Sequence, residues 1–245
     1  MTTPSAGLWA ISWSGGKDSA LALDRAVRAG LDVRYLVTLY DPAAGRVRFH
    51  GTPVPVLEMQ AAALGREMMA LPAPWEQFDA ILREGLADLA GRGVTGMLFG
   101  NIHLADVRAW YEEQVVAAGL RHHEPLWGAA PATLLREVIE RGHSAHLVSI
   151  DTTRLPASWL GRALDGSCAA DLAERADVDP CGEYGEYHTL VTDGPLFRYP
   201  LAVRPGSRRV EGPFALLDVE VDDGREHAAA WPMASDRAES PGEAP

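Results

Sequence analysis

A short glycine-containing segment between an apolar run and a helical pattern carries residue types that can bind phosphate. It reads Ser14-Gly15-Gly16-Lys17-Asp18-Ser19. A strand that turns through two glycines into a helix leaves several backbone N–H groups unpaired, and the helix dipole adds partial positive charge there. The glycines also allow the backbone to approach an anion closely, and Lys17 adds a mobile charge. The segment therefore predicts an anion site.

The remaining polar residues and the spacing of the segment indicate which anion binds. Asp18 next to a phosphate is repulsive unless Mg²⁺ lies between them, which makes Asp18 the predicted metal ligand. Ser19 can cap the helix or donate to phosphate. The spacing matches neither Gly-x-x-x-x-Gly-Lys-Ser/Thr nor Gly-x-Gly-x-x-Gly. It resembles the PP-loop of the ATP pyrophosphatases, which implies that the outer phosphates of ATP are held while a nucleophile attacks the α-phosphorus. The alternative is an ordinary glycine-rich turn with a capping serine.

A second group of chemically capable side chains lies at residues 179–189. Two glutamates, two tyrosines and a histidine surround two glycines there. Glu183 and Glu186 flank Gly185, so both carboxylates could face one pocket. They could orient an amine nucleophile, take its proton or hold Mg²⁺. The alternative is a polar hairpin loop that leads into a strand.

The elements that must position these residues alternate between strands and helices. Strands are expected at 8–13, 33–39, 68–71 and 97–99, and helices after the glycine segment and at 56–64, 75–90 and 107–118. This alternation predicts an α/β fold, a Rossmann-like parallel sheet with helices on both faces. Ligands of such sheets bind beyond the carboxyl ends of the strands. The segments 14–19, 38–41 and 100–103 all fall there, so Thr38 and Gly100 are expected to join the glycine segment in one crevice.

The pattern becomes less regular beyond residue 151. We expect helices at 133–141 and 169–175, strands at 146–150, 187–191 and 214–221, a short extended piece at 47–49 and a solvated turn at 204–209. Residues 1–128 are therefore predicted to form a PP-loop nucleotide-binding domain and 129–222 a smaller α+β substrate-binding domain. The acidic, Ala-rich and Pro-rich residues 223–245 are expected to be a disordered tail.

Composition limits the classes of protein that fit. The chain has 245 residues, 47% of them hydrophobic, and a formal net charge of −12, which opposes broad binding to nucleic acid. Its two cysteines indicate no disulfide framework. Neither a membrane span nor a secretory signal is visible, so we expect a cytoplasmic protein. The oligomeric state is left open, with a homodimer as one alternative.

Several motifs occur in an order that resembles the diphthine-ammonia ligase family, a branch of the PP-loop ATP pyrophosphatases within the adenine nucleotide alpha hydrolase superfamily. The resemblance covers most of residues 8–200. The motifs are Ser14 to Ser19, Gly100-Asn101-Ile102, Glu112, Pro125-Leu126-Trp127, Leu160-Gly161-Arg162, Gly182-Glu183-Tyr184-Gly185-Glu186-Tyr187-His188-Thr189 and Asp193-Gly194-Pro195-Leu196-Phe197.

The resemblance implies an ATP- and Mg²⁺-dependent amidation. A substrate carboxylate is adenylylated and then attacked by ammonia, with release of AMP and pyrophosphate. In the namesake reaction the carboxylate belongs to diphthine, a modified histidine of a translation elongation factor. The glycine segment would bind phosphates, Gly100 to Ile102 would line the adenosine side, and the two glutamates would face substrate or ammonia, with Lys17, Glu183 and Glu186 as the catalytic group. Asn101 departs from the Asp that many members carry at that position.

Two alternatives to amidation begin with the same loop. One is tRNA thiolation or another base modification, in which Cys168 or Cys181 would carry sulfur. The other is a sensor that binds ATP or AMP without turnover. The two glutamates argue against the sensor, because such a protein has no evident need for carboxylates beside the nucleotide.

Overall fold

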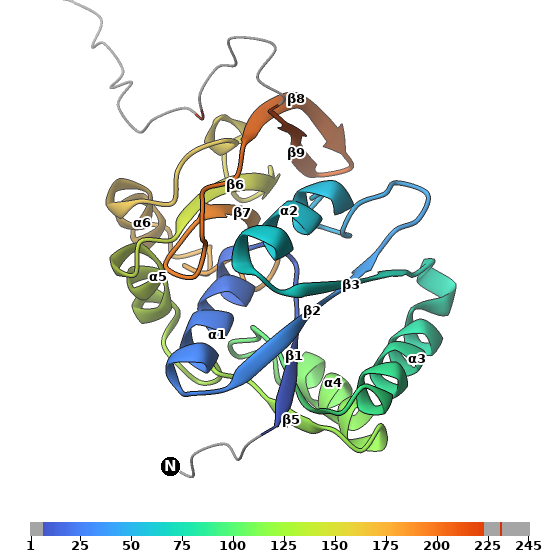
Figure 1. Ribbon diagram of the computed structural model, residues 1–245. Helices are drawn as coiled ribbons and strands as arrows, with labels where there is room; N and C mark the ends of the chain where they lie inside the picture. Colours follow the sequence, from blue (N-terminus) through green and yellow to red (C-terminus); the bar gives the residue numbers. More distant parts are fainter. Residues whose placement is uncertain (1–6, 223–230, 232–245) are drawn as a thin grey trace, which may run out of the picture.

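The computed structural model describes residues 7–222 and Trp231, and its strands form two sheets (Figure 1). The first is a parallel sheet of five strands in the order β3-β2-β1-β4-β5, and the second is an antiparallel sheet in the order β7-β6-β9-β8. The predicted α/β class, with a smaller α+β part after the parallel sheet, is confirmed.

The parallel sheet is built from short crossover units. Its strands are β1 (Leu8–Ser12), β2 (Asp32–Tyr40), β3 (Glu67–Pro72), β4 (Val94–Leu98) and β5 (Arg121–His123). The connections contain α1 (Lys17–Arg28), α2 (Val54–Leu64), the 3₁₀ turn η1 (Trp75–Gln77), α3 (Phe78–Gly91) and α4 (Ala105–Ala117). Apart from β5, each of these strands was expected from its run of apolar residues.

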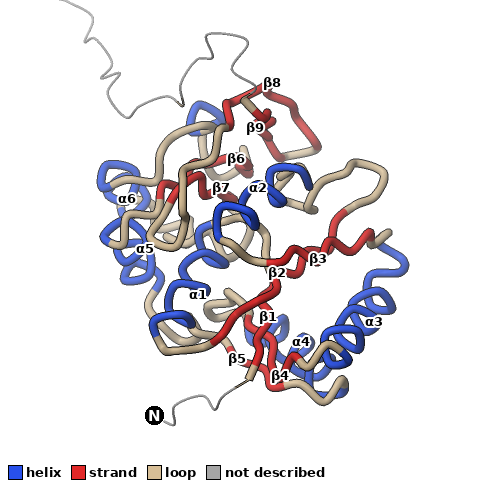
Figure 2. Tube along the Cα trace, viewed as in Figure 1, coloured by secondary structure: helices blue, strands red, loops and turns tan. Residues whose placement is uncertain are grey.

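Helices cover both faces of this sheet, as Figure 2 shows by colour. Successive side chains of a strand point to opposite faces. On β1, Trp9 and Ile11 therefore join the core under α1 and α2, whereas Ala10 joins the core under α3 and α4. Burial on both faces explains why the central strands are almost wholly apolar.

The second half of the described chain packs against the first through a shared core. It contains α5 (Pro131–Glu140), β6 (Ser144–Asp151), the 3₁₀ turn η2 (Ala157–Trp159), α6 (Gly166–Ala173), β7 (Tyr187–Asp193), β8 (Val203–Glu211) and β9 (Phe214–Val221). Leu134 of α5 and Leu147 of β6 belong to the same apolar cluster as Leu21 of α1. Because one core runs across residue 128, the proposed domain division there stays a prediction.

Two local expectations were wrong. The arginine-rich segment at 204–209 is part of β8, not a solvated turn. Pro205 and Gly206 interrupt the alternating pattern that would have predicted a strand, and the pairing with β9 is irregular beside them. Cross-strand ion pairs between Arg204 and Glu220 and between Arg209 and Asp218 stabilise the pairing. Residues 47–49 lie in a loop instead of an extended piece.

The tail predicted for 223–245 lies outside the described residues except for Trp231. The indole of Trp231 stacks on His146 with ring centroids 4.2 Å apart.

Candidate active site

The predicted phosphate loop connects the carboxyl end of β1 to α1 and is held from behind by a buried amide. Gly15 has φ 80°, and a Cβ there would lie 2.6 Å from Leu57 and 2.7 Å from Gln60. Gln60 donates to the Gly15 carbonyl at 3.1 Å and accepts from the Trp13 indole at 2.8 Å. Glycine is therefore required for both conformation and space, and the amide network fixes the position of the loop.

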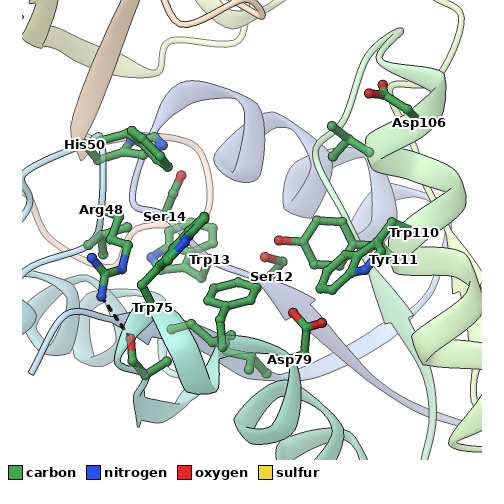
Figure 3. A pocket seen from close by; sticks show the side chains of 17 residues that line it. Ser12, Trp13, Ser14, Arg48, His50, Trp75, Asp79, Asp106, Trp110 and Tyr111 are labelled. Carbon is green, nitrogen blue, oxygen red and sulfur yellow. Dashed lines mark hydrogen bonds between the residues drawn. The ribbon is translucent and has the colours of Figure 1, made fainter.

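Two adjoining cavities open in front of this loop. The smaller, of about 210 Å³, is lined by polar groups from the loop, the β4–α4 connection and residues 182–189. The larger, of about 640 Å³, is bounded by β1, β2, the loop 47–50, η1, α3 and α4 (Figure 3). Both share Ser12, Ser14, His50 and Tyr111. A polar compartment thus opens beside an aromatic one of a size that suits a small ligand.

Lys17 is the only lysine of the chain and lies at the back of the smaller cavity. It is 2% exposed, and its Nζ donates to Asp18 at 2.9 Å and to the Cys181 carbonyl. The same nitrogen lies 4.8 Å from the centroid of the Tyr187 ring. Burial lowers the pKa of Lys17, but Asp18 and the other neighbours raise it more, so the net pKa is raised and the ammonium stays charged.

Two carboxylates line the smaller cavity, and each is held by a neighbour. Burial raises the pKa of Asp18, and the Lys17 ammonium opposes this rise. Burial also raises the pKa of Glu183, against the effect of the Ile102 N–H, which donates to Oε1 of Glu183 at 2.9 Å. A carboxylate whose pKa is raised is better suited to accept a proton from an attacking amine than one at its ordinary value.

Glu186 has a different environment from Glu183. Its side chain is 1% exposed, and it lines neither cavity. One oxygen accepts from the Asp179 N–H and from Arg154, both at 3.0 Å, and the other accepts from the Tyr184 N–H at 3.1 Å. These contacts stabilise the 179–186 turn, so the structure brings Glu183 to the cavity and places Glu186 behind it.

Of the other predicted site residues, some line the smaller cavity and others are buried outside it. Gly100 and Asn101 line the smaller cavity with Ser14, Asp18 and Ser19. Gly15 and Gly16 form the adjacent bend. Thr38 and Ile102 are buried and line neither cavity; the Thr38 hydroxyl donates to the Trp13 carbonyl at 2.6 Å.

The structure also brings in residues that sequence reasoning missed. They include His50, Trp75, Phe78 and Tyr111, together with His188 and Thr189, which were quoted as part of a motif but given no role. His50 belongs to a loop without a recognisable pattern. Phe78 was expected to belong to an apolar core stripe of its helix, and only its position at the start of α3 could have suggested a cavity. Tyr111 lies within a helix that the sequence predicted without assigning it a role.

Gly100→Ala tests whether the first turn of α1 must keep its position. An added Cβ would lie 3.0 Å from the Asp18 carbonyl carbon and 3.1 Å from the Ser19 nitrogen, so this backbone would have to shift. We expect the Kd for ATP, measured by calorimetry, to rise about tenfold, because the shift should remove about one hydrogen bond between the loop and a phosphate. Gly166→Ala, which meets no atom within 4 Å, should bind as the wild type does. Equal affinities for both variants would remove Gly100 from the site.

Comparison with known proteins supports the arrangement. The model of the diphthamide synthase N-terminal domain matches residues 8–122, and that of the diphthamide synthase C-terminal domain matches residues 130–222. These ranges include both the glycine loop and the Glu183 turn. The chain belongs to the diphthamide synthase family.

Three curated relatives whose sequences match part of this chain are all named diphthine–ammonia ligase. Diphthine–ammonia ligase of Schizosaccharomyces pombe is 34% identical over 82 residues, that of Homo sapiens 35% over 81 and that of Danio rerio 36% over 81. Each match covers 32% to 33% of this chain. It covers 14% of the length of the S. pombe protein, 30% of the human protein and 32% of the D. rerio protein. The described helices all fall short of the length and apolar character of a transmembrane segment.

Proposed function

We propose that this member of the diphthamide synthase family is an ATP-dependent ligase that amidates a carboxylate through an acyl-adenylate, with ammonia as the nitrogen source. The observation that carries the proposal is the convergence of the glycine loop, Lys17, Asn101 and Glu183 on one small polar cavity. A site that combines phosphate donors with a carboxylate base can activate an acid and then receive an amine. This combination is what a PP-loop ligase requires.

The larger cavity is the proposed site of adenosine. Its walls include Val37 and Leu39 at the carboxyl end of β2 and the rings of Trp75 and Phe78. Apolar and aromatic side chains suit the flat, uncharged adenine ring, and the shared residue Ser14 connects this wall to the phosphate loop. The base would then lie beside the strand ends, while the phosphates would extend into the polar cavity.

The donor set of the smaller cavity fits Mg²⁺. The Asp18 side chain is 29% exposed and lines this cavity. Within the described part of the chain, no group of three or more His, Cys, Asp or Glu side chains could enclose a metal. Mg²⁺ commonly binds through one or two carboxylates together with phosphate oxygens and water, so Asp18 would hold it. The ion would there neutralise phosphate charge.

The chemistry proceeds in two displacements. A carboxylate oxygen of the substrate attacks the α-phosphorus, the bond from the α-phosphorus to the bridging oxygen breaks, and pyrophosphate leaves with the electron pair. Ammonia then attacks the acyl carbon, AMP leaves with the electrons of the C–O bond, and Glu183 accepts the proton lost by nitrogen. The Lys17 ammonium stabilises the charge that develops on pyrophosphate.

The names of the curated relatives suggest diphthine as the carboxylate. The resemblance drawn from the motifs then implies a translation elongation factor as the protein partner. The test is to incubate the full chain with ATP, Mg²⁺, ammonium and candidate carboxylates, including a diphthine-bearing factor. Formation of AMP, pyrophosphate and an amide is expected. ADP and phosphate as the products, or no turnover with any acid, would contradict the proposal.

Cys181→Ala separates amidation from sulfur transfer. Burial raises the pKa of the Cys181 thiol to about 12 and that of Cys168 to about 11, so neither sulfur is a ready nucleophile. The Cys181 thiol donates to the Pro131 carbonyl at 3.2 Å, whereas Lys17 contacts only its backbone carbonyl. We expect unchanged AMP formation and a stability loss of about 1 kcal/mol by urea denaturation. Lost turnover with intact ATP binding would favour thiolation instead.

A further inference from the structure

Two histidines, one from a loop of the first half of the chain and one from a strand of the second sheet, lie ring against ring at the junction of the two cavities. His50 comes from the loop between β2 and α2, and His188 is the second residue of β7. Their ring centroids are 4.1 Å apart, with 35° between the planes. Both line the smaller cavity, and His50 also lines the larger one. The pair therefore links the two halves of the molecule at the place where we put the phosphates.

The pair lies directly against the glycine loop. A Cβ added to Gly16 would be 3.3 Å from Cε1 of His50 and 3.0 Å from the Thr189 carbonyl. The Thr189 hydroxyl accepts from the Lys17 N–H at 3.0 Å, which holds the end of the loop against β7. Nδ1 of His50 is buried without a hydrogen-bond partner among the described residues. An unpaired polar nitrogen at this position is costly unless a ligand contributes the missing partner.

Both imidazoles have pKa values that lie below the ordinary value of histidine. Burial and the nearby Lys17 charge together lower the pKa of His50 to about 4, against the opposing effect of a backbone hydrogen bond with Thr189. Burial, His50 and Lys17 together hold the pKa of His188 well below its ordinary value. Besides Lys17, the titratable groups that line the two cavities are Asp18 on α1, Arg48 on the same loop as His50, Asp79 on α3, Asp106 and Tyr111 on α4, Glu183 in the 179–186 turn and Tyr187 on β7.

We propose that the His50–His188 pair is a polyphosphate-binding element that takes up a proton when a polyphosphate enters the smaller cavity. This inference rests on the proposed function, because it assumes that phosphates bind there. A polyphosphate adds negative charge beside the two rings, which opposes the effect of the Lys17 ammonium on them and so favours an imidazolium that donates to phosphate oxygens. Two imidazolium rings 4.1 Å apart would repel each other, so the pair takes up about one proton.

The sign of the pH dependence follows from linkage. The liganded state holds more protons than the free state, so affinity is greatest at low pH and falls as pH rises through the pKa of the pair in the complex. From about pH 4, the pKa of His50 in the free protein, pyrophosphate should bind more weakly as pH increases, until the pKa of the pair in the complex is passed. Since pyrophosphate titrates in this range too, the comparison is the difference between the wild type and a variant that lacks both imidazoles of the pair.

The experiment is calorimetric titration of the full chain with pyrophosphate in buffers of different ionisation enthalpy. We expect about one more proton taken up by the wild type than by the double variant His50→Gln/His188→Gln, in which no imidazole of the pair remains, and a Kd about tenfold higher for that variant. His123→Gln changes a histidine on β5 that lines neither cavity and should behave as the wild type. AMP, which lacks the outer phosphates, should bind without the additional proton.

The possible outcomes separate this inference from the proposed function. If the wild type and the double variant bind pyrophosphate with the same Kd and the same proton uptake, the inference is overturned and the phosphate site stands. If neither pyrophosphate nor ATP binds the wild type, the proposed function fails with it. If a variant does not fold, NMR titration of the wild-type histidine rings decides: saturating pyrophosphate must raise the pKa of one ring of the pair, and unchanged values overturn the inference.

Discussion

Lys17→Ala is expected to lower AMP formation at least about a hundredfold and to leave the protein folded. The Lys17 ammonium is buried in the polar cavity, where water cannot replace its charge. Removing one group of this kind from a site that stabilises developing negative charge typically costs about 10²–10³ in rate. No second lysine in the chain can take its place.

The effect of Lys17→Ala on the stability of the fold can be measured separately from its effect on the rate of AMP formation. Without Lys17, the Cys181 carbonyl and the Asp18 carboxylate each lose a donor, which should cost about 1–3 kcal/mol in the free energy of unfolding. Urea denaturation measures this cost, and chromatography of nucleotides measures AMP. Arg28→Ala is the matched control, since this cation lies at the other end of α1 and pairs with Asp24 and Glu137. A Lys17→Ala protein with wild-type AMP formation would remove the loop from the mechanism.

A direct check of the Lys17 contact does not depend on a variant. Because the chain has one lysine, ¹⁵N-lysine labelling gives a single side-chain ammonium signal. Addition of pyrophosphate should shift that signal if the Nζ exchanges its present acceptors for phosphate oxygens. An unchanged signal at saturating pyrophosphate would place the phosphates elsewhere.

Glu183→Gln is expected to reduce amide formation about 10²–10⁴-fold while adenylylation continues. The carboxylate lines the polar cavity and is oriented by the Ile102 N–H. A glutamine keeps the shape and the bond to Ile102 but cannot accept a proton from ammonia. Exchange of labelled pyrophosphate into ATP, which needs only the first displacement, should persist when the carboxylate substrate is present.

Glu186→Gln distinguishes the two glutamates. Its carboxylate accepts from the Asp179 N–H, the Tyr184 N–H and Arg154, so the substitution should lower stability by about 1.5–3 kcal/mol. We expect exchange and amide formation to fall together, if they fall at all, because the turn as a whole is loosened. If Glu186→Gln selectively lost amide formation and Glu183→Gln did not, Glu186 would be the base instead of Glu183.

Comparison of particular elements explains which predictions succeeded. The strands around Ile11 and Leu36 were predictable because burial on both faces demands continuous apolar runs. The β8 strand was not, because Pro205 and Gly206 break the pattern and its stability comes from pairing with β9. Thr38 was placed at the correct strand end, yet its hydroxyl bonds to Trp13. Position along a strand is local information, whereas the direction of one hydroxyl depends on neighbours far away in the chain.

The chain alone determined the glycine bend, its charge and the strand-helix alternation, because these depend on φ preferences, side-chain type and hydrophobic period within a few residues. Tertiary packing decided which distant groups face that bend. Glu183 and Glu186 are three positions apart in one motif, but the turn directs one carboxylate into the cavity and the other toward Arg154. His50 and His188 meet only because β7 and the loop after β2 are packed against the same glycines. The His50–His188 contact joins residues more than a hundred positions apart, and no local pattern encodes it.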